Sequence, residues 1–378
     1  MSNSSIPSKG SSYISAPNFD AFKLPVGLAL PQGPPPGTLF ASWFSFFMDI
    51  RVPIAIAGIY ATLVHIANHF RRTNKEPLAF TKTKAFKWLV LAHNMGLCIY
   101  SAWTCAGMSA AIYRTVFELS KAAIGASTDP DTLAQYVAGN ATLLGSSSGR
   151  TSGSFWRSLC DINDGIWEQG LSYYGFFFYL SKFYEVFDTV IILAKGRQSS
   201  LLQTYHHAGA MLSMWAGIRF ASPPIWIFVV FNSLIHTIMY FYYTLSALKV
   251  SVPRLLKRAL TTAQICQFVF GGSFAVLHMF VYYFNPSTGK YCPCLETPGQ
   301  LFALVFNVVY LAPLTYLFVN FWIESYVRGW KRADLAKKQN KVIEKSVSSS
   351  SSTTSLDASS GSSTSVPPPS ITSRSRKD

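Results

Sequence analysis

The chain has 378 residues, of which 49% are hydrophobic, 15% are aromatic and only 13% are charged. This composition excludes an ordinary soluble globular domain and indicates a membrane protein. The formal net charge of +15 does not indicate nucleic-acid binding, because the basic residues are scattered between apolar runs rather than gathered on one soluble module.

The two ends of the chain have the composition of disordered segments. Residues 1–45 are rich in Ser and Pro, and we expect them to be disordered. Residues 1–30 also lack an apolar core behind a basic start, so we expect no cleavable signal peptide. Residues 331–378 are first basic and then rich in Ser, and we expect a disordered tail. The domain predicted between these segments covers residues 46–330.

Apolar runs of bilayer-spanning length recur through the predicted domain. They predict an all-α integral membrane protein with seven spans, at residues 53–70, 86–110, 171–193, 201–220, 225–248, 260–284 and 300–324. The basic residues fall mainly in alternate loops, for example Arg71 and Arg72 after the first span and Arg254 and Lys257 after the fifth. The positive-inside rule then predicts a luminal N-terminus and a cytosolic C-terminus.

The loops predicted to face the lumen carry two candidate modification sites. The sequence Asn140-Ala141-Thr142 is a glycosylation sequon in the long loop between the second and third spans. Three of the six cysteines also fall in these loops, where oxidation is favoured. One disulfide is predicted, from Cys160 to either Cys292 or Cys294.

Two stripes of polar residues interrupt the predicted spans. Side chains three or four residues apart share a helix face, which places Gln203, His206 and His207 on one stripe. The other stripe, just upstream, consists of Lys182, Glu185 and Asp188. Ionisable groups inside a bilayer are costly and usually functional. The sequence therefore indicates chemistry inside a membrane.

Four consecutive predicted spans place polar side chains at similar depth. Depth is counted along the helix axis from the nearest basic residue at the predicted cytosolic end. At a rise of 1.5 Å per residue, Asp188 lies ~10 Å from Lys195, and His206 lies ~13 Å from Arg197. Similar depths apply to His236 and Tyr240 in the next span and to Gln264 and Gln267 in the one after it. Structural explanations stay open for several of these residues: Lys182 and Glu185 as an ion pair, the two glutamines as contacts between helices, and the tyrosines as an interfacial belt.

Several other classes of membrane protein are alternatives to this interpretation. His65 and His69, four residues apart, form an HxxxH box beside the later histidines, as in membrane di-iron desaturases and hydroxylases of fatty acyl chains. Those enzymes carry about eight His ligands in three boxes, whereas this chain has seven His and no middle box. A receptor needs no such cluster, and a transporter usually shows an internal repeat that is not apparent here.

The polar motifs together resemble the ELO/ELOVL family of very-long-chain fatty acid elongases, which are 3-oxoacyl-CoA synthases. Residues 182–189 fit the family's KxxExxDT motif, residues 203–207 resemble its HxxHH box, and residues 232–243 are similar to its NSxVHxxMYxYY motif. Thr261, Gln264 and Gln267 fit TxxQxxQF, and Asp49 and Arg51 fit DxRV. The match covers residues 45–330. The departure is Gln203, where most members have His, so the chain resembles a QxxHH variant.

The resemblance implies condensation of acyl-CoA with malonyl-CoA to give 3-oxoacyl-CoA, carbon dioxide and free CoA. It implies no metal or redox cofactor. It further implies a multi-pass protein of the endoplasmic reticulum membrane, in contact with the lipids of that membrane. The implied protein partners are a 3-ketoacyl-CoA reductase, a 3-hydroxyacyl-CoA dehydratase and an enoyl-CoA reductase, and self-association into a homo-oligomer is left open.

A mechanistic hypothesis for this condensation assigns a role to each predicted catalytic residue. His206 is the predicted nucleophile, because an imidazole can carry an acyl group and no cysteine shares the histidine face. His207 would orient His206 or take its proton, and Asp188 or Glu185 would fix its tautomer. His236 would lie beside malonyl-CoA. The remaining predicted catalytic residue is Gln203.

Further residues are predicted to bind substrate around an enclosed central acyl tunnel. Candidate donors to the developing oxyanion are Gln264, Gln267 and Tyr240. Candidate ligands of the CoA phosphates are Lys182, Lys195, Arg254 and Lys257. The family motifs add Thr189, Asn232 and Tyr243 to the predicted substrate-binding residues.

Overall fold

The computed structural model describes residues 12–23, 41–118, 155–285, 288–328 and 339. The sequon at Asn140, most of the N-terminal segment and all of the tail 331–378 except residue 339 lie outside the described residues. The chain divides into two units, Met1–Trp322 and Ile323–Asp378. The described part of the second unit consists of the π-helix η6 (Ile323–Arg328), with an ion pair between Arg328 and Glu324, and of residue 339.

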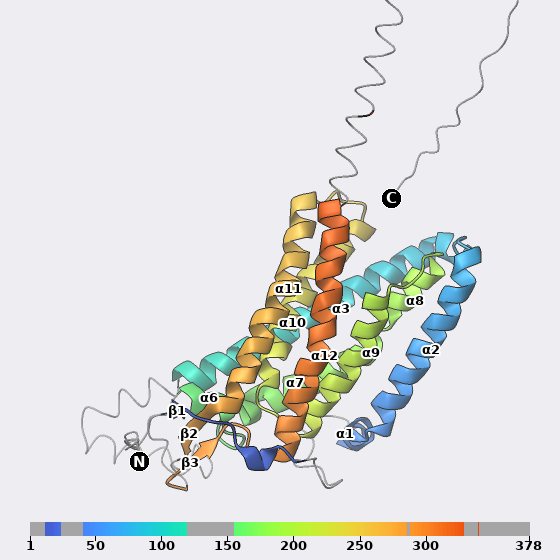
Figure 1. Ribbon diagram of the computed structural model, residues 1–378. Helices are drawn as coiled ribbons and strands as arrows, with labels where there is room; N and C mark the ends of the chain where they lie inside the picture. The colour runs from blue at the N-terminus through green and yellow to red at the C-terminus, as the bar shows by residue number, and fades with distance from the viewer. Residues whose placement is uncertain (1–11, 24–40, 119–154, 286–287, 329–338, 340–378) are drawn as a thin grey trace, which may run out of the picture. The chain divides into compact units, whose positions relative to one another are not determined.

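The first unit is a bundle of long helices that run side by side (Figure 1). Its principal helices are α2 (Arg51–Thr73), α3 (Lys84–Ile112), α7 (Ser172–Tyr184), α8 (Phe187–Ala194), α9 (Leu201–Arg219), α10 (Ile225–Ala247), α11 (Arg254–Leu277) and α12 (Pro298–Trp322). Shorter helices are α1 (Ala41–Met48) and α6 (Phe155–Cys160), with η1 (Phe19–Ala21), η2 (Ala79–Lys82), η3 (Tyr113–Glu118), η4 (Trp167–Leu171) and η5 (His278–Phe280).

Five of the described helices are long and apolar enough to cross a membrane: α2, α3, α10, α11 and α12. The chain is therefore a multi-pass membrane protein with mostly helical structure. The two remaining predicted spans are also helical but less regular. Residues 171–193 are divided between α7 and α8 at Glu185 and Val186, and α9 carries the polar residues of the QxxHH box.

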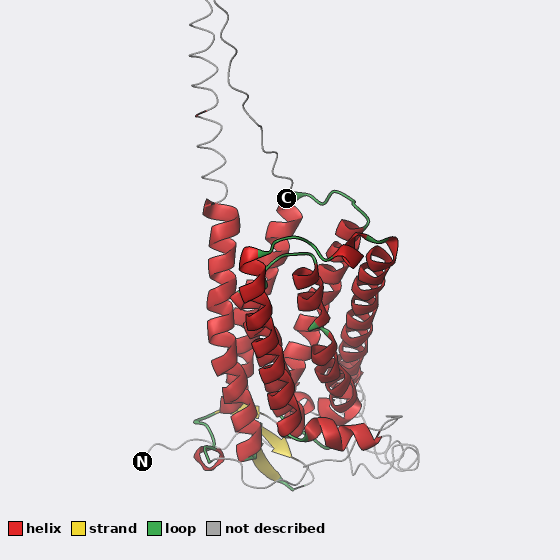
Figure 2. Ribbon diagram, turned by 90° about the vertical axis from the view of Figure 1, so that its right-hand side faces the viewer, coloured by secondary structure: helices red, strands yellow, loops and turns green. Residues whose placement is uncertain are grey.

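A small sheet, which the prediction of an all-α chain did not include, lies at one end of the helical bundle. There β1 (Ser12–Ile14), β2 (Val281–Asn285) and β3 (Lys290–Pro293) form an antiparallel sheet in the order β1-β2-β3. Figure 2 draws the strands in yellow. The span predicted at 260–284 therefore ends early, because α11 stops at Leu277 and residues 281–284 enter β2. Alternating buried and half-buried side chains in β2 are typical of a strand packed on one face.

Part of the N-terminal segment that was expected to be disordered is ordered. Tyr13 pairs with Tyr282 in the sheet and their rings stack, with centroids 5.3 Å apart. At the other end of the segment, α1 packs into the core through Phe44 and Met48, and the Trp215 indole donates to the Met48 carbonyl oxygen. These contacts come from distant parts of the chain, which the local composition of residues 1–45 does not reveal.

The corner between α1 and α2 is held by the DxRV residues. The Asp49 carboxylate accepts the backbone N–H of Arg51 at 3.0 Å and pairs with its guanidinium. The side-chain hydrogen bonds from Arg51 lower the pKa of Asp49 to about 2. Asp49 therefore stays ionised and satisfies one of the free N–H groups at the start of α2.

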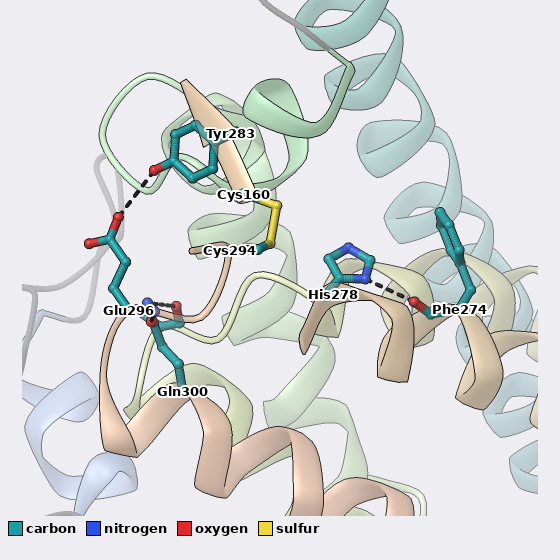
Figure 3. The surroundings of a disulfide bond; sticks show 8 residues. Cys160, Phe274, His278, Tyr283, Cys294, Glu296 and Gln300 are labelled. Atoms are coloured by element: carbon teal, nitrogen blue, oxygen red, sulfur yellow. Dashed lines mark hydrogen bonds between the residues drawn. A yellow bond between two sulfur atoms is a disulfide. The ribbon is translucent and has the colours of Figure 1, made fainter. Parts of the chain in front are cut away.

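A disulfide joins Cys160, at the end of α6, to Cys294, just after β3 (Figure 3). Of the two partners predicted for Cys160, the structure thus uses Cys294, and Cys292 is among the described cysteines outside a disulfide. The bridge lies in a small apolar cluster with Val281 and Tyr283. It ties the sheet to the segment that precedes α7.

Removing this disulfide is expected to destabilise the sheet end of the bundle. The bridge closes a loop of 134 residues, and loss of a native disulfide typically costs ~2–5 kcal/mol of unfolding free energy. Cys160→Ser should therefore lower the thermal unfolding midpoint of the detergent-solubilised protein, as should treatment with a reductant. Cys292→Ser is the matched control and should leave the midpoint unchanged. Equal midpoints for Cys160→Ser and the unaltered chain would contradict the expectation.

Candidate active site

Asp188 is clamped by side chains from two neighbouring helices. Its Oδ1 lies 2.9 Å from His93 Nε2 on α3, and its Oδ2 accepts the Tyr240 hydroxyl of α10 at 2.6 Å. His93 Nδ1 also lies 3.3 Å from the Tyr184 hydroxyl. Asp188, which was predicted as one of two carboxylates that could fix the tautomer of His206, thus has the His93 imidazole as its partner. Sequence reasoning missed it, although His93 lies six residues, ~9 Å, from Lys87, a depth that matches Asp188.

Lys182 and Glu185 form a buried ion pair at 2.7 Å. The Ser181 hydroxyl also donates to Glu185 Oε1, at 2.9 Å, and Lys182 Nζ donates to Asn232 Oδ1 at 3.3 Å. The second carboxylate oxygen, Glu185 Oε2, lies 3.7 Å from His236 Nδ1. The KxxE residues thus connect α7 to α10 and bring a carboxylate toward the third histidine.

Gln203 links His207 to α8. Its amide nitrogen lies 3.0 Å from His207 Nε2 and 3.4 Å from Thr189 Oγ1, which is itself 2.8 Å from the Tyr60 hydroxyl of α2. An amide NH2 group can donate two hydrogen bonds but accept none. His207 Nε2 is therefore the acceptor, and the proton of a neutral His207 resides on Nδ1.

The three histidines of α9 and α10 form a contiguous row. The ring centroids of His206 and His207 are 5.2 Å apart, and those of His206 and His236 are 6.2 Å apart. His207 and His236 are buried, whereas His206 keeps part of its surface open to a cavity. The Tyr310 hydroxyl of α12 donates to the His206 carbonyl oxygen at 3.0 Å. This row is a group of bases beside an open space.

The cavity next to His206 has about 520 Å³ of space that no atom fills, a volume that includes its opening to the surroundings. Helices α7, α9, α10, α11 and α12 line it. Its polar lining includes Lys182, His206, Asn232, Gln267 and Tyr310, and most of the remaining lining is apolar, as in Phe178, Ala210, Met214, Ile227, Phe228, Phe231, Phe268, Leu311 and Leu314. A cavity that is polar beside a histidine and otherwise apolar fits a ligand with a reactive head and a hydrocarbon body.

Several predicted site residues lie away from this cavity. The Gln264 amide contacts Met239 Sδ at 3.8 Å, and Tyr243 is 39% exposed. The candidate phosphate ligands Lys195, Arg254 and Lys257 are all exposed, and Lys257 lies over the Tyr242 ring at 5.5 Å. His65 and His69 of the HxxxH box are also exposed. The HxxxH and QxxHH boxes therefore do not converge on one centre.

Tyr310 is a second site residue that sequence reasoning missed. Its ring stacks on Tyr205 with centroids 5.6 Å apart, and the Tyr205 hydroxyl donates to the Tyr310 carbonyl oxygen at 3.1 Å. The ring lies against Gly209, which has no side chain to obstruct it. Because the chain has 19 tyrosines, no pattern in the sequence singles this one out.

Gly209→Ala is expected to disturb the wall beside His206. A Cβ at Gly209 would lie 2.2 Å from a ring carbon of Tyr310, and overpacking of this kind typically costs ~1–3 kcal/mol. Thermal unfolding should show the loss. The matched control is Gly58→Ala on α2, where a Cβ meets no atom within 4 Å. If both variants unfold at the same temperature, Tyr310 does not depend on the absence of a side chain at Gly209.

Residues 45–334 match the family described as "ELO: GNS1/SUR4 family". The chain belongs to this family. Among curated relatives, fatty acid elongase 2 of Trypanosoma brucei brucei is 32% identical over 183 residues, which is 48% of this chain and 66% of the relative. Very long chain fatty acid elongase 1 of Mus musculus is 36% identical over 168 residues, 43% of this chain and 56% of the relative.

The match to these two members spans between about half and two thirds of their own length. A putative fatty acid elongase of Dictyostelium discoideum is matched more fully, with 26% identity over 282 residues, 74% of this chain and 77% of the relative. No solved structure gives a significant match to the chain.

Proposed function

We propose that the chain is a fatty acid elongase, which condenses a long-chain acyl-CoA with malonyl-CoA to give 3-oxoacyl-CoA, carbon dioxide and CoA. In enzyme terms it is an acyltransferase, a very-long-chain 3-oxoacyl-CoA synthase. One observation carries the proposal: His206 borders a largely apolar cavity and stands in a row with two further histidines. Family membership and the elongase names of the relatives support the same reaction.

The first half of the proposed reaction transfers the acyl group to His206. The unprotonated ring nitrogen of His206 attacks the thioester carbonyl, the C–S bond breaks, and the proton of the other ring nitrogen is transferred to the departing CoA sulfur, which leaves a neutral acyl-imidazole and the CoA thiol. We assign the adjacent His207 the orientation of His206 rather than the uptake of its proton, because Gln203 donates to His207 Nε2 and a neutral His207 already carries a proton on Nδ1. Forming an acyl-imidazole divides one difficult condensation into two easier steps.

The second half joins the two carbon chains. Malonyl-CoA loses carbon dioxide, the resulting enolate carbon attacks the acyl carbonyl, and the C–N bond to His206 breaks as the new C–C bond forms. The released imidazole takes up one proton from solvent, which regenerates neutral His206. His236 is proposed to lie beside the malonyl group, with Glu185 3.7 Å from its Nδ1. Gln267, which lines the cavity, is the proposed donor near the developing oxyanion. Tyr240 contacts the His236 ring edge-on and its hydroxyl donates to Asp188, so its proposed role is to position His236.

The geometry also changes the roles assigned from the sequence to Asp188 and Gln264. Asp188 contacts His93 and Tyr240, so we assign it the positioning of Tyr240 rather than the tautomer of His206. Gln264 packs on Met239, so we assign it to contacts between helices. Lys182 is proposed to keep Glu185 ionised, and the exposed Lys195, Arg254 and Lys257 remain proposed ligands of the CoA phosphates.

The wider setting follows from the same proposal. Seven spans, with α7–α8 and α9 completing the five long helices, would enclose the cavity as an acyl tunnel with a luminal N-terminus and a cytosolic C-terminus. The proposed location is the endoplasmic reticulum, where a ketoreductase, a dehydratase and an enoyl reductase would consume the product. The condensation is redox-neutral, so the proposal includes no metal or redox cofactor. The di-iron alternative is not favoured, because His65 and His69 are exposed.

Purified protein supplied with acyl-CoA and carboxyl-labelled malonyl-CoA should release labelled carbon dioxide and form 3-oxoacyl-CoA. Omitting the acyl-CoA is the control for uncoupled decarboxylation. Desaturation or hydroxylation of the acyl chain in the presence of iron and a reductant, without carbon dioxide release, would overturn the proposal in favour of the di-iron class.

A further inference from the structure

Asn307 is a buried amide in the wall of the cavity. The residue is 6% exposed and lies on α12 among largely apolar lining residues. Its amide makes no hydrogen bond to any residue that the structure describes. A buried amide without a partner is costly. The free energy is recovered only when water or a ligand in the cavity supplies the missing hydrogen bonds.

The position of Asn307 along the cavity follows from the packing of α12 on α9. Tyr310 bonds the carbonyl of His206, whereas Gly299, at the start of α12, lies against Phe220, just after α9. The two helices are therefore antiparallel. Asn307 lies three residues, ~4.5 Å of helix rise, from Tyr310 in the direction away from His206. The amide thus faces the body of a bound acyl chain rather than its thioester.

We propose that Asn307 makes the cavity selective for acyl chains that carry a hydrogen-bond-accepting group beyond the carboxyl end. The shared chemistry is an electron-rich group that takes the amide N–H, either a hydroxyl oxygen or the π-face of a cis double bond. This inference rests on the proposed function, in which the acyl chain occupies the cavity. A saturated chain displaces water from Asn307 and accepts no hydrogen bond from its amide, whereas a chain with such a group accepts one.

The other small polar group of the apolar wall does not compete for this role. The Ser213 hydroxyl donates to the Gly209 carbonyl oxygen of its own helix at 2.7 Å, so its proton is already used. Two other amides line the cavity: Asn232, whose Oδ1 accepts from Lys182, and Gln267, whose Oε1 has no hydrogen-bond partner among the described residues. The proposed function places both beside the reacting groups, so discrimination along the hydrocarbon body is assigned to Asn307. Sites that offer a hydrogen bond to the substrate disfavour analogues that lack the matching group.

The test compares three acyl-CoAs of equal length: saturated, cis-unsaturated and hydroxylated, with the functional group moved stepwise along the chain. Dissociation constants are measured with thioether analogues of the three acyl-CoAs, which cannot acylate His206, and elongation is measured separately with the thioesters. The unaltered protein should bind the best hydroxylated chain about tenfold more tightly than the saturated one, equivalent to ~1.4 kcal/mol. The best unsaturated chain should bind about threefold more tightly, because N–H···π contacts are weaker.

Asn307→Leu, which keeps the number and branching of the side-chain heavy atoms, should abolish both preferences and improve binding of the saturated chain, and Asn307→Ala should abolish them if the leucine variant does not fold. Ser213→Ala is the matched control and should retain them. The proposal is overturned if the unaltered protein shows no preference, if the Asn307 variants keep it, or if Ser213→Ala loses it equally. Because binding needs no turnover, absence of elongation with every chain would count against the proposed function alone.

Discussion

His206→Ala is expected to abolish condensation, with a loss of roughly 10³-fold or more in kcat, as removal of a covalent nucleophile causes in other enzymes. His206 is the histidine of the row that borders the cavity. Its immediate neighbours are His207 and His236, neither of which lines the cavity. The loss should appear in kcat rather than in the affinity for acyl-CoA, because the apolar lining is unchanged. Initial rates of labelled carbon dioxide release measure it.

Cys266→Ala is the control for this result. Cys266 is exposed on α11 and is adjacent in sequence to the cavity residue Gln267. Its thiol is outside the described cavity lining, so its replacement should leave the rate unchanged. A His206→Ala variant with full activity, or an inactive Cys266→Ala variant, would remove His206 from the role of nucleophile.

Lys182→Met is expected to lower the unfolding free energy by ~3–5 kcal/mol, because it leaves the Glu185 carboxylate buried without its counter-ion. The two side chains are 3% and 2% exposed and 2.7 Å apart. Thermal unfolding in detergent measures the loss. The double variant Lys182→Met with Glu185→Gln removes both charges and should recover much of the lost stability.

Lys257→Met is the matched control, because it removes a lysine charge from an exposed position instead of a buried one. Lys257 is exposed on α11, and surface substitutions usually change stability by no more than ~0.5 kcal/mol. The account of the buried pair is contradicted if Lys182→Met is as stable as Lys257→Met, or if the double variant is less stable than Lys182→Met alone.

The positions of the helices could be predicted from the sequence because bilayer-length apolar runs are a strong signal. The predicted span at 225–248, for example, corresponds to α10 at Ile225–Ala247. The end of α11 was harder to predict, because the residues of β2 are as apolar as those of a span. The pairing of β1 with β2 joins segments more than 250 residues apart in sequence, and such contacts leave no local pattern.

The contacts of the candidate site were predictable only in part. Spacing on one helix placed Lys182 beside Glu185 and Gln203 beside His207, and both pairs are in contact. Contacts between helices depend on the rotation of each helix about its axis, which spacing does not give. For this reason the sequence did not reveal that Asp188 contacts His93, or that Gln264 faces Met239 while Gln267 faces the cavity.

The most direct test of the account is to incubate the protein with acyl-CoA in the absence of malonyl-CoA and to map the acyl group by mass spectrometry. The account predicts one acyl group on His206, with release of an equal amount of free CoA, and transfer of that group to product when malonyl-CoA is added. An acyl group on Cys266, or condensation without any acylated protein, would contradict it.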